Sequence, residues 1–329
     1  MAAGVVKIIK KCYTTFINPI QFLQKCMITL EDNQMNGVNL MEGQKKVLIS
    51  CDSTCDLSDE LMQRYSIAGN PLFVVMNGKT LRDGVDVYPD DIYAYYKNTG
   101  EIPKTTAANM DDFLSYFRPF VDAGYAVVHF TISSSMSATF NNARMAAAEL
   151  EDVYVIDSKC LSTGAGLEVP KAAELAQAGL DARTIASQVS SMWERVDASF
   201  VIDSLEYLHK GGRCSSVAAL GANLLRLKPC IEVKNGVMGV GKKYRGRFGD
   251  VLMEYAAARL SDPDDIELDR AFVTHAGCKQ ELVNRVADRV RELLPFKEVL
   301  VTRAGCSVSV HCGPNTLGVL FVRKTPIIK

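Results

Sequence analysis

The chain has 329 residues, enough for about two domains, and its 48% hydrophobic and 23% charged residues are typical of a soluble globular protein. Its 37 Lys and Arg nearly balance its 38 Asp and Glu, so we expect no nucleic-acid partner, which would require a basic excess. Ten cysteines are scattered through a chain too large to need disulfide bonds, which favours reduced thiols and a cytoplasmic location. We expect no transmembrane segment, because no apolar run approaches the ~18–20 residues of a membrane-spanning helix.

Residues 1–46 form an N-terminal extension of uncertain status with a net charge of +3. A signal peptide is not expected, because lysines break the apolar stretch and no Ala-x-Ala cleavage site follows. Residues 5–11 are typical of a basic amphipathic helix, which would lie on a membrane surface or dock on a partner protein. Two further interpretations are a poorly ordered extension and a natural start at Met41, six residues before the first clear strand.

The first domain is predicted over residues 47–200, where short apolar runs alternate with stretches of helical periodicity. Strands that alternate with helices of this length indicate parallel βαβ units with right-handed crossovers. The predicted strands lie at 47–50, 71–75, 126–131 and 153–156, and the predicted helices lie at 58–66, 90–97, 110–123, 138–150, 165–178 and 182–195.

The pattern changes near residue 200, and residues 201–324 are predicted to form a mixed α+β domain. Asn235-Gly236 favours a hairpin turn after a strand at 228–233. The predicted fold class is therefore α/β, with two α/β domains, a parallel first sheet with flanking helices, and a mixed second domain. The remaining strands of the second domain are expected at 200–203, 271–275, 298–302 and 317–322, and its helices at 205–208, 249–260 and 280–293.

The common nucleotide and catalytic motifs are missing from the chain. No Gly-x-Gly-x-x-Gly follows the first strand and no Gly-x4-Gly-Lys-Ser/Thr occurs, which argues against the usual nucleotide cofactors. The Gly-x-Ser-x-Gly elbow of many hydrolases is also missing. Cys51 and Cys55 lack a second close pair, and the four histidines lack metal-binding spacing, so we expect no metal and no cofactor.

Hydroxyl-bearing loops instead follow several of the predicted strands, at 52–54, 105–106, 133–137 and 157–158. Ligands of open parallel sheets bind outside the carboxyl ends of the strands, so we expect these loops to gather around a ligand. Ser137 lies at the start of the predicted helix at 138–150, where the helix dipole favours an anion. Its hydroxyl can either cap the helix or hold a carboxylate, and the local sequence favours the cap.

Seven short motifs occur in a fixed order between about residues 47 and 323. They are Asp-Ser-Thr-Cys-Asp-Leu at 52–57, Thr-Thr-Ala-Ala-Asn at 105–109, Ile-Ser-Ser-Ser-Met-Ser-Ala-Thr-Phe at 132–140, Asp-Ser at 157–158 with Ser162, Gly164 and Gly166, Leu-Glu-Tyr-Leu-His-Lys-Gly-Gly-Arg at 205–213, Leu-Lys-Pro at 227–229 and Val-His-Cys-Gly-Pro at 310–314. In this order they resemble the DegV family of fatty-acid-binding proteins. The resemblance spans nearly all of the chain outside the extension.

The resemblance implies two α/β domains with a long-chain fatty acid in a buried tunnel between them. The carboxylate-binding residues of the family correspond to Thr105 and Ser137, which favours the carboxylate role of Ser137 over helix capping. Further residues are implied near the ligand head or on the same loop, namely Ser133, Ser134, Arg213 and His311.

The resemblance also implies a partner, because family members present the bound acid to a separate ATP-dependent fatty acid kinase that phosphorylates its carboxylate. The missing phosphate-binding motif fits this division of labour. The chain departs from the family pattern at Ala107 and Ala108, which replace Gln-Pro, at Ala138, which replaces Gly, and at Asn315, which follows Gly-Pro where Gly is usual. These departures indicate a changed ligand geometry or chain-length preference.

The leading hypothesis is a fatty-acid carrier that is not itself an enzyme. An alternative is an acyl hydrolase or transferase with Ser137 or Ser53 as nucleophile and His311 as base, because a serine nucleophile needs a base within hydrogen-bonding reach. A third hypothesis is a structural or regulatory interaction module. The basic run at 242–247 is either a docking or phosphate-facing surface or a solvated turn.

Overall fold

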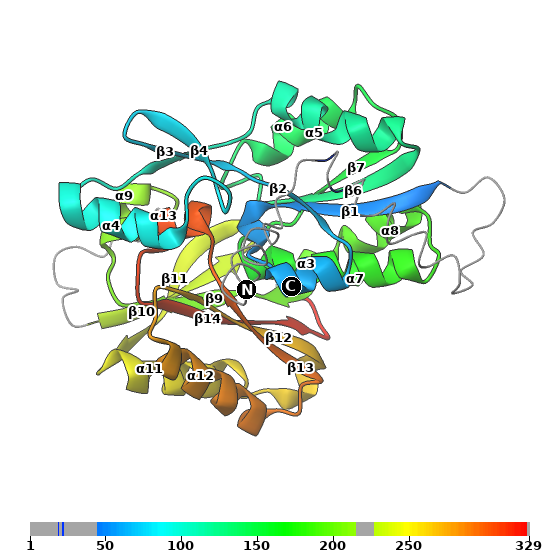
Figure 1. Ribbon diagram of the computed structural model, residues 1–329. Helices are drawn as coiled ribbons and strands as arrows, with labels where there is room; N and C mark the ends of the chain where they lie inside the picture. The colour runs from blue at the N-terminus through cyan, green and yellow to red at the C-terminus, as the bar shows by residue number, and fades with distance from the viewer. Residues whose placement is uncertain (1–18, 20–21, 23–44, 215–226, 328–329) are drawn as a thin grey trace, which may run out of the picture.

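The structure, a computed structural model, describes residue 19, residue 22 and residues 45–214 and 227–327 (Figure 1). Most of the extension at 1–46 lies outside the described residues, so its interpretations stay open. None of the helices in these ranges combines the length and the apolar character that crossing a membrane requires. The described strands form three sheets.

The first sheet is parallel and has helices on both faces (Figure 1). Its strands are β1 (Lys46–Asp52), β2 (Ala68–Asn70), β6 (Tyr125–Thr131) and β7 (Val153–Asp157). The helical elements along this part of the chain are η1 (Ser53–Cys55), α3 (Asp59–Arg64), α5 (Met110–Asp122), α6 (Thr139–Ala147), α7 (Thr163–Gln177) and α8 (Ala182–Val189). The strand order is β2-β1-β6-β7. Successive side chains of a strand point to opposite faces, so Leu48 joins the cluster with Phe113 of α5, and Ile49 joins the cluster with Ala165 of α7. Burial on both faces explains the continuous apolar runs of these strands.

The second sheet is mixed and has seven strands. They are β8 (Val196–Asp197), β9 (Ser199–Ile202), β10 (Leu227–Lys234), β11 (Val237–Arg245), β12 (Ile266–Ala276), β13 (Glu298–Arg303) and β14 (Thr316–Arg323). The helical elements along this part of the chain are η2 (Met192–Arg195), α11 (Phe248–Arg259), η4 (Pro263–Asp265) and α12 (Gln280–Leu293). The order is β11-β10-β9-β14-β12-β13, with β8 paired to β14. Only the β12–β13 pair among these described strands is parallel. A parallel first sheet and a mixed second sheet confirm the predicted fold class.

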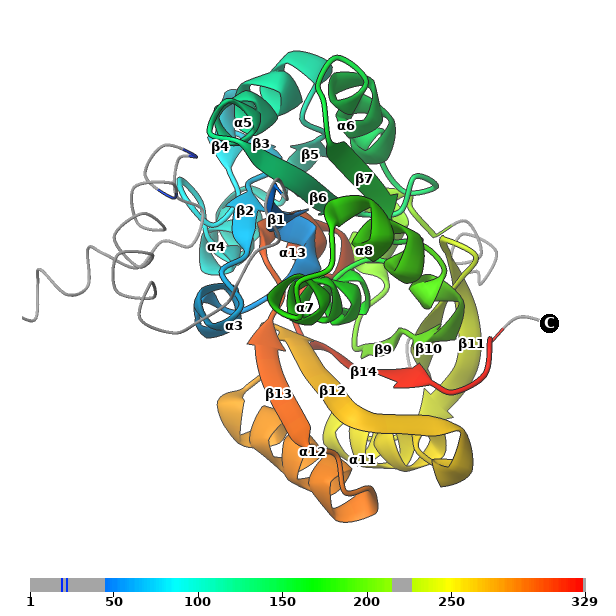
Figure 2. The same ribbon diagram turned by 90° about the vertical axis from the view of Figure 1, so that its right-hand side faces the viewer.

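Helix α7 lies between the two sheets and contributes to the core of both (Figure 2). Its Ala165 belongs to the cluster of the first sheet, whereas Leu167 belongs to the cluster that contains Phe272 of the second. A Cβ atom on Gly166 would lie 2.7 Å from the carbonyl oxygen of Cys55, so glycine allows the helix to approach η1. The chain enters the second sheet at β8, close to the predicted boundary at residue 200. The domain limits of 47–200 and 201–324 stay predictions.

A third, antiparallel sheet lies beside α4 and α13; these elements are β3 (Phe73–Met76), β4 (Lys79–Arg82), α4 (Pro89–Thr99), β5 (Lys104–Thr106) and α13 (Cys306–Cys312). The sequence predicted a strand near β3 but neither β4, β5 nor α13, which are too short to show a clear periodicity. Thr105 therefore lies in a strand, and His311 lies in the last turn of α13.

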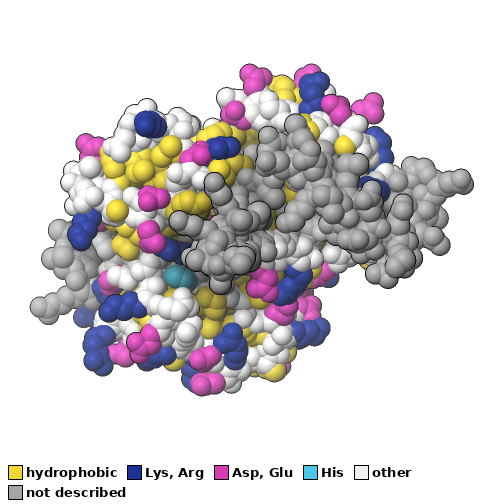
Figure 3. Space-filling model, viewed as in Figure 1, with side chains coloured by type: hydrophobic (Ala, Val, Ile, Leu, Met, Phe, Trp, Pro, Cys, Tyr) yellow, Lys and Arg dark blue, Asp and Glu magenta, His cyan; other side chains and the backbone are white. Residues whose placement is uncertain are grey.

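Charged side chains of both signs are interspersed over the described surface in Figure 3, which agrees with the formal charge of −1. The basic run at 242–247 begins in the edge strand β11 and not in a turn. Lys242 pairs with Glu254 at 3.0 Å, and Arg247 pairs with Asp250 at 2.9 Å, so part of its charge is neutralised within the chain.

Candidate functional site

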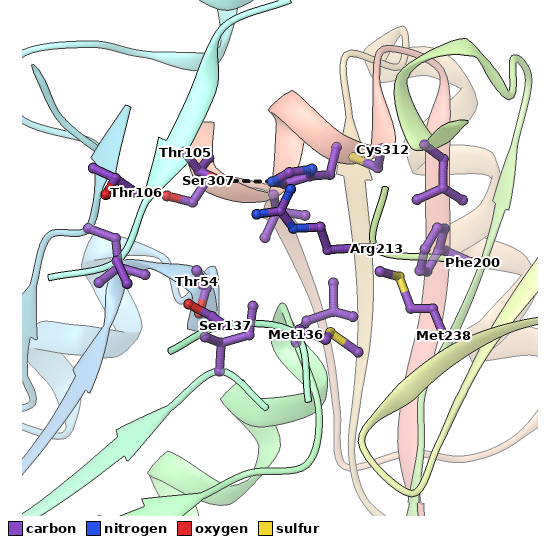
Figure 4. A pocket seen from close by; sticks show the side chains of 17 residues that line it. Thr54, Thr105, Thr106, Met136, Ser137, Phe200, Arg213, Met238, Ser307 and Cys312 are labelled. Atoms are coloured by element: carbon purple, nitrogen blue, oxygen red, sulfur yellow. Dashed lines mark hydrogen bonds between the residues drawn. The ribbon is translucent and has the colours of Figure 1, made fainter. Parts of the chain in front are cut away.

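A cavity of about 80 Å³ lies where segments from both halves of the chain meet (Figure 4). Thr54 reaches it from η1, Thr105 from β5 and Ser137 from the loop before α6. The second half of the chain contributes Ser307 and His311 of α13, together with Arg213, which follows α9 (Glu206–Gly211). Four of the residues that the sequence singled out thus lie around one cavity: Thr105, Ser137, Arg213 and His311.

The cavity has a polar end and an apolar end. Figure 4 shows Thr105 and Thr106 on one side of it and Phe200 and Met238 on the opposite side. Hydroxyl groups can bind a polar head by hydrogen bonds, whereas the hydrophobic effect favours contact of the apolar side chains with a hydrocarbon. The arrangement therefore fits an amphiphile with one polar end.

The Thr105 hydroxyl lies 2.9 Å from Nε2 of His311, which joins β5 to α13 across the polar end. Burial, with a smaller effect of the Arg213 charge, lowers the pKa of His311 to about 4. The imidazole is therefore neutral at pH 7, with one nitrogen as donor and the other as acceptor. Its Nδ1 has no hydrogen-bond partner among the described residues.

Ser137 bonds locally at the start of α6 and also lines the cavity. Its Oγ lies 2.7 Å from Oγ1 of Thr139 and 3.3 Å from the Thr139 N–H at the start of α6. The N-cap residue of α6 is Ala138, whose side chain cannot accept a hydrogen bond. A hydroxyl has one donor and two acceptor positions, so Ser137 can bond locally and still reach a ligand.

Ser307 is a site residue that the sequence analysis missed. Its side chain lines the cavity and is only 6% exposed, and its Oγ has no hydrogen-bond partner in the described part of the chain. A buried hydroxyl without a partner is costly unless a ligand or water bonds to it. The Thr54 hydroxyl, in contrast, is already bonded to Asp52.

Two buried acidic side chains from the first half of the chain hold the start of α13. Asp83 accepts hydrogen bonds from the N–H groups of Cys306 and Ser307 at 2.7 and 2.8 Å. Asp56 accepts one from the N–H of Gly305 at 2.7 Å, and burial raises its pKa to about 8. These contacts satisfy N–H groups that have no partner within a helix, and they fix the helix that carries Ser307 and His311.

Arg213 supplies a positive charge at the cavity. Its guanidinium donates to the carbonyl oxygen of Gly211 at 2.7 Å, two residues earlier in the chain. Within the described ranges, no acidic side chain forms an ion pair with it. Its charge can therefore stabilise an anion in the cavity.

Ser133 and Ser134, the second candidates on the loop before α6, do not line this cavity. The Ser133 hydroxyl donates to the carbonyl oxygen of Gly236 at 2.7 Å and so ties the loop to the turn between β10 and β11. The Ser134 hydroxyl accepts from Lys159 at 3.0 Å. These bonds tie the loop to its neighbours, and the predicted role of the two residues near the ligand head stays a prediction.

The arrangement gives little support to a serine nucleophile. The described contacts pair His311 with Thr105 and Ser137 with Thr139, and Ser53 donates to Asp83 at 3.1 Å. A different Ser–His pair, Ser50 and His129 at 2.9 Å, is fully buried among aromatic rings and lines none of the cavities described here. Across the described residues, no three His, Cys, Asp or Glu side chains are arranged to bind a metal ion.

Comparison with known proteins gives consistent results. The family model described as an uncharacterised protein of the DegV family matches residues 46–324. A DegV domain-containing protein of Clostridium perfringens is 31% identical over 279 residues, which cover 84% of this chain and 98% of the relative. A fatty acid-binding protein of Thermotoga maritima is 28% identical over 281 residues, which cover 83% of this chain and 96% of the relative.

Solved structures show the same similarity. A DegV family protein of Thermus thermophilus, described by its fatty acid binding, has a TM-score of 0.78 at 27% identity and covers 84% of this chain and 99% of its own. A stearic acid-binding protein of Eubacterium ventriosum has a TM-score of 0.74 at 28% identity and covers 84% and 98% of the two chains.

Proposed function

The chain belongs to the DegV family, and we propose that it binds a long-chain fatty acid in the cavity between its two large sheets. The observation that carries the proposal is the polarity of this cavity, with hydroxyls at one end and Phe200 and Met238 at the other. In this assignment Thr105, Ser137 and Ser307 hold the carboxylate. Relatives described as fatty-acid-binding proteins support the same ligand class.

Energetics assign different tasks to the two ends of the ligand. Burial of one methylene contributes ~0.8 kcal/mol, so a chain of about 16 carbons gains on the order of 10 kcal/mol. A hydrogen bond contributes only about 1 kcal/mol net, or somewhat more to a charged group. The tail therefore supplies most of the affinity, and the hydroxyls with Arg213 fix the orientation of the head.

A titration of lipid-free protein with palmitate tests the proposal. We expect the double variant Thr105→Ala/Ser137→Ala to bind at least ~10-fold more weakly than the wild type, because two hydrogen bonds to a carboxylate are lost. The variant Ser134→Ala is the matched control, since its hydroxyl lies on the same loop but outside the cavity. Equal affinities of all three proteins would contradict the assignment of the head-group site.

We further propose that the protein is a carrier without catalytic activity of its own and presents the acid to an ATP-dependent fatty acid kinase. The missing phosphate-binding motif supports a role for a separate protein that binds ATP. A cytoplasmic location fits the eight described cysteines, all of which are free thiols. Acid-loaded protein should yield acyl phosphate, trapped as a hydroxamate, only when kinase and ATP are both added. Formation with ATP alone would contradict the carrier role.

A further inference from the structure

A second cavity, of about 40 Å³, lies next to the first. The two cavities share four lining residues, Leu161, Phe200, Val308 and Cys312. None of the head-group residues Thr105, Ser137 or Arg213 lines the second cavity. The four shared residues therefore form a partition. On one side lies the first cavity with the head-group residues, and on the other lies a cavity that the head-group residues do not line.

The second cavity suits hydrocarbon, although several polar residues line it. Their hydroxyl groups are bonded within the protein and so do not require a polar ligand. These bonds join Ser162 to Asp56 at 2.5 Å, Ser199 to Tyr255 at 2.9 Å, Thr274 to Thr163 at 2.5 Å, and Thr316 to the carbonyl oxygen of Cys312 at 3.0 Å. His275 also lines the cavity, and its Nδ1 has no hydrogen-bond partner among the described residues. The remaining lining is mainly aliphatic, with Ala198, Val233 and Leu320 among its residues.

Phe200 has the largest side chain of the partition. It lies in β9 and is directly paired with Gly318 of β14, which also lines the second cavity. The surroundings of Gly318 are closely packed, because a Cβ atom there would lie 3.1 Å from Cδ1 of Leu320 and 3.2 Å from Cβ of Phe200. The room available to the phenyl ring is therefore the second cavity itself. Phe200 is also only partly buried, although β9 is an inner strand of the sheet.

We propose that the second cavity receives the end of the acyl chain and that the Phe200 ring limits the chain length that the protein accepts. This inference rests on the proposed function. A carboxylate near Thr105 directs the tail toward Phe200, which lies across the first cavity from it (Figure 4). A short tail ends at the ring. A longer tail enters the second cavity only after the ring moves aside.

The proposal predicts a break in the dependence of affinity on chain length. Each buried methylene strengthens binding about fourfold, so affinity should rise steadily until the tail meets the ring. Beyond this length, further methylenes must displace the ring, and the rise should flatten. In Phe200→Ala the two cavities are joined, and the steady rise should continue to longer acids.

The experiment measures dissociation constants of a series of saturated acids, of about 8 to 18 carbons, for the wild type and its variants. Met238→Ala is the matched control, because Met238 lines the first cavity only, and this variant should keep the break of the wild type. Phe200→Leu is a second variant for the case that alanine at this strand position impairs folding, and it should shift the break to longer acids. Thermal melting confirms that each variant is folded.

The outcomes separate the inference from the function on which it rests. A wild-type break that is unchanged in both Phe200 variants would overturn the role of Phe200 while leaving fatty acid binding intact. A break that also disappears in Met238→Ala would overturn the partition, because general enlargement of the first cavity would then suffice. Failure of the wild type to bind any acid would overturn the proposed function itself.

Discussion

The two ends of the cavity are built in different ways. The head end comes from short segments far apart in the chain, such as β5 and α13, and the buried side chain of Asp83 holds the start of α13. The tail end comes from β9 and its neighbours in a regular seven-stranded sheet. In the proposed function, the orientation of the ligand therefore depends on a few irregular segments, whereas the capacity for hydrocarbon follows from the ordinary apolar face of a sheet.

Removal of the carboxylate that holds α13 should have the largest effect. In Asp83→Ala, two backbone N–H groups and the Ser53 hydroxyl lose a buried acceptor, which should lower the free energy of unfolding by about 2–4 kcal/mol. Urea denaturation measures this change. Asp86→Ala removes a more exposed carboxylate that pairs with Arg82 and should cost less than about 1 kcal/mol. Equal losses would show that α13 does not depend on Asp83.

Helix α7 contributes to the cores of both large sheets and offers a test outside the cavity. Glu168 is fully buried, and neither of its carboxylate oxygens has a partner among the described residues. Burial raises the pKa of its carboxyl well above the ordinary value of 4.5. The unfolded state therefore binds fewer protons above pH 4.5, and stability should fall as pH rises, by about 1.4 kcal/mol per pH unit until the raised pKa is reached.

Glu168→Gln should remove this contribution, so the difference in stability between variant and wild type should change steadily with pH. Urea denaturation at several pH values above about 5 measures it. Glu174→Gln is the control on the same helix, since Glu174 pairs with Arg270 at 3.2 Å. A pH-independent difference between wild type and Glu168→Gln would show that Glu168 has no raised pKa.

A change at Ser307 tests the head end of the cavity separately from the tail end. In Ser307→Ala, one hydrogen bond to the carboxylate is lost, and affinity should fall by roughly 5–10-fold. The loss should be the same for every chain length, in contrast to changes at Phe200. A competition assay with acids of different length measures both quantities. A loss that grows with chain length would place Ser307 along the tail instead of at the head.

The smallest expected effect concerns catalysis. The described contacts give Ser137 no histidine partner, so an activated acyl ester should produce no burst of acylation in the wild type. His311→Ala should behave in the same way. A burst in the wild type that disappears in His311→Ala would favour the acyl hydrolase or transferase and contradict the carrier.

Much of the regular structure followed from the sequence, because long strands and helices carry a clear periodicity. The apolar run at 126–131 predicted β6, and Asn235-Gly236 predicted the hairpin between β10 and β11. The short elements were missed for the opposite reason. Helix α13 has seven residues, and its start is held by Asp83, more than 200 residues earlier in the chain, so no local pattern reports it.

The site was predictable to the extent that its residues belong to motifs. The resemblance implied Thr105, Ser137, Arg213 and His311, and these side chains line one cavity. Ser307 lies outside the quoted motifs, and only its buried, unpartnered hydroxyl singles it out. Phe200 looks like any apolar residue of a strand, and only the structure shows that it lines both cavities.

Native mass spectrometry of freshly purified protein, followed by lipid extraction of the same sample, tests the central claim most directly. The account predicts a stoichiometric excess of mass that matches one long-chain fatty acid and that decreases in Thr105→Ala/Ser137→Ala but not in Ser134→Ala. Protein that carries no acid and also fails to take up added acid would contradict it.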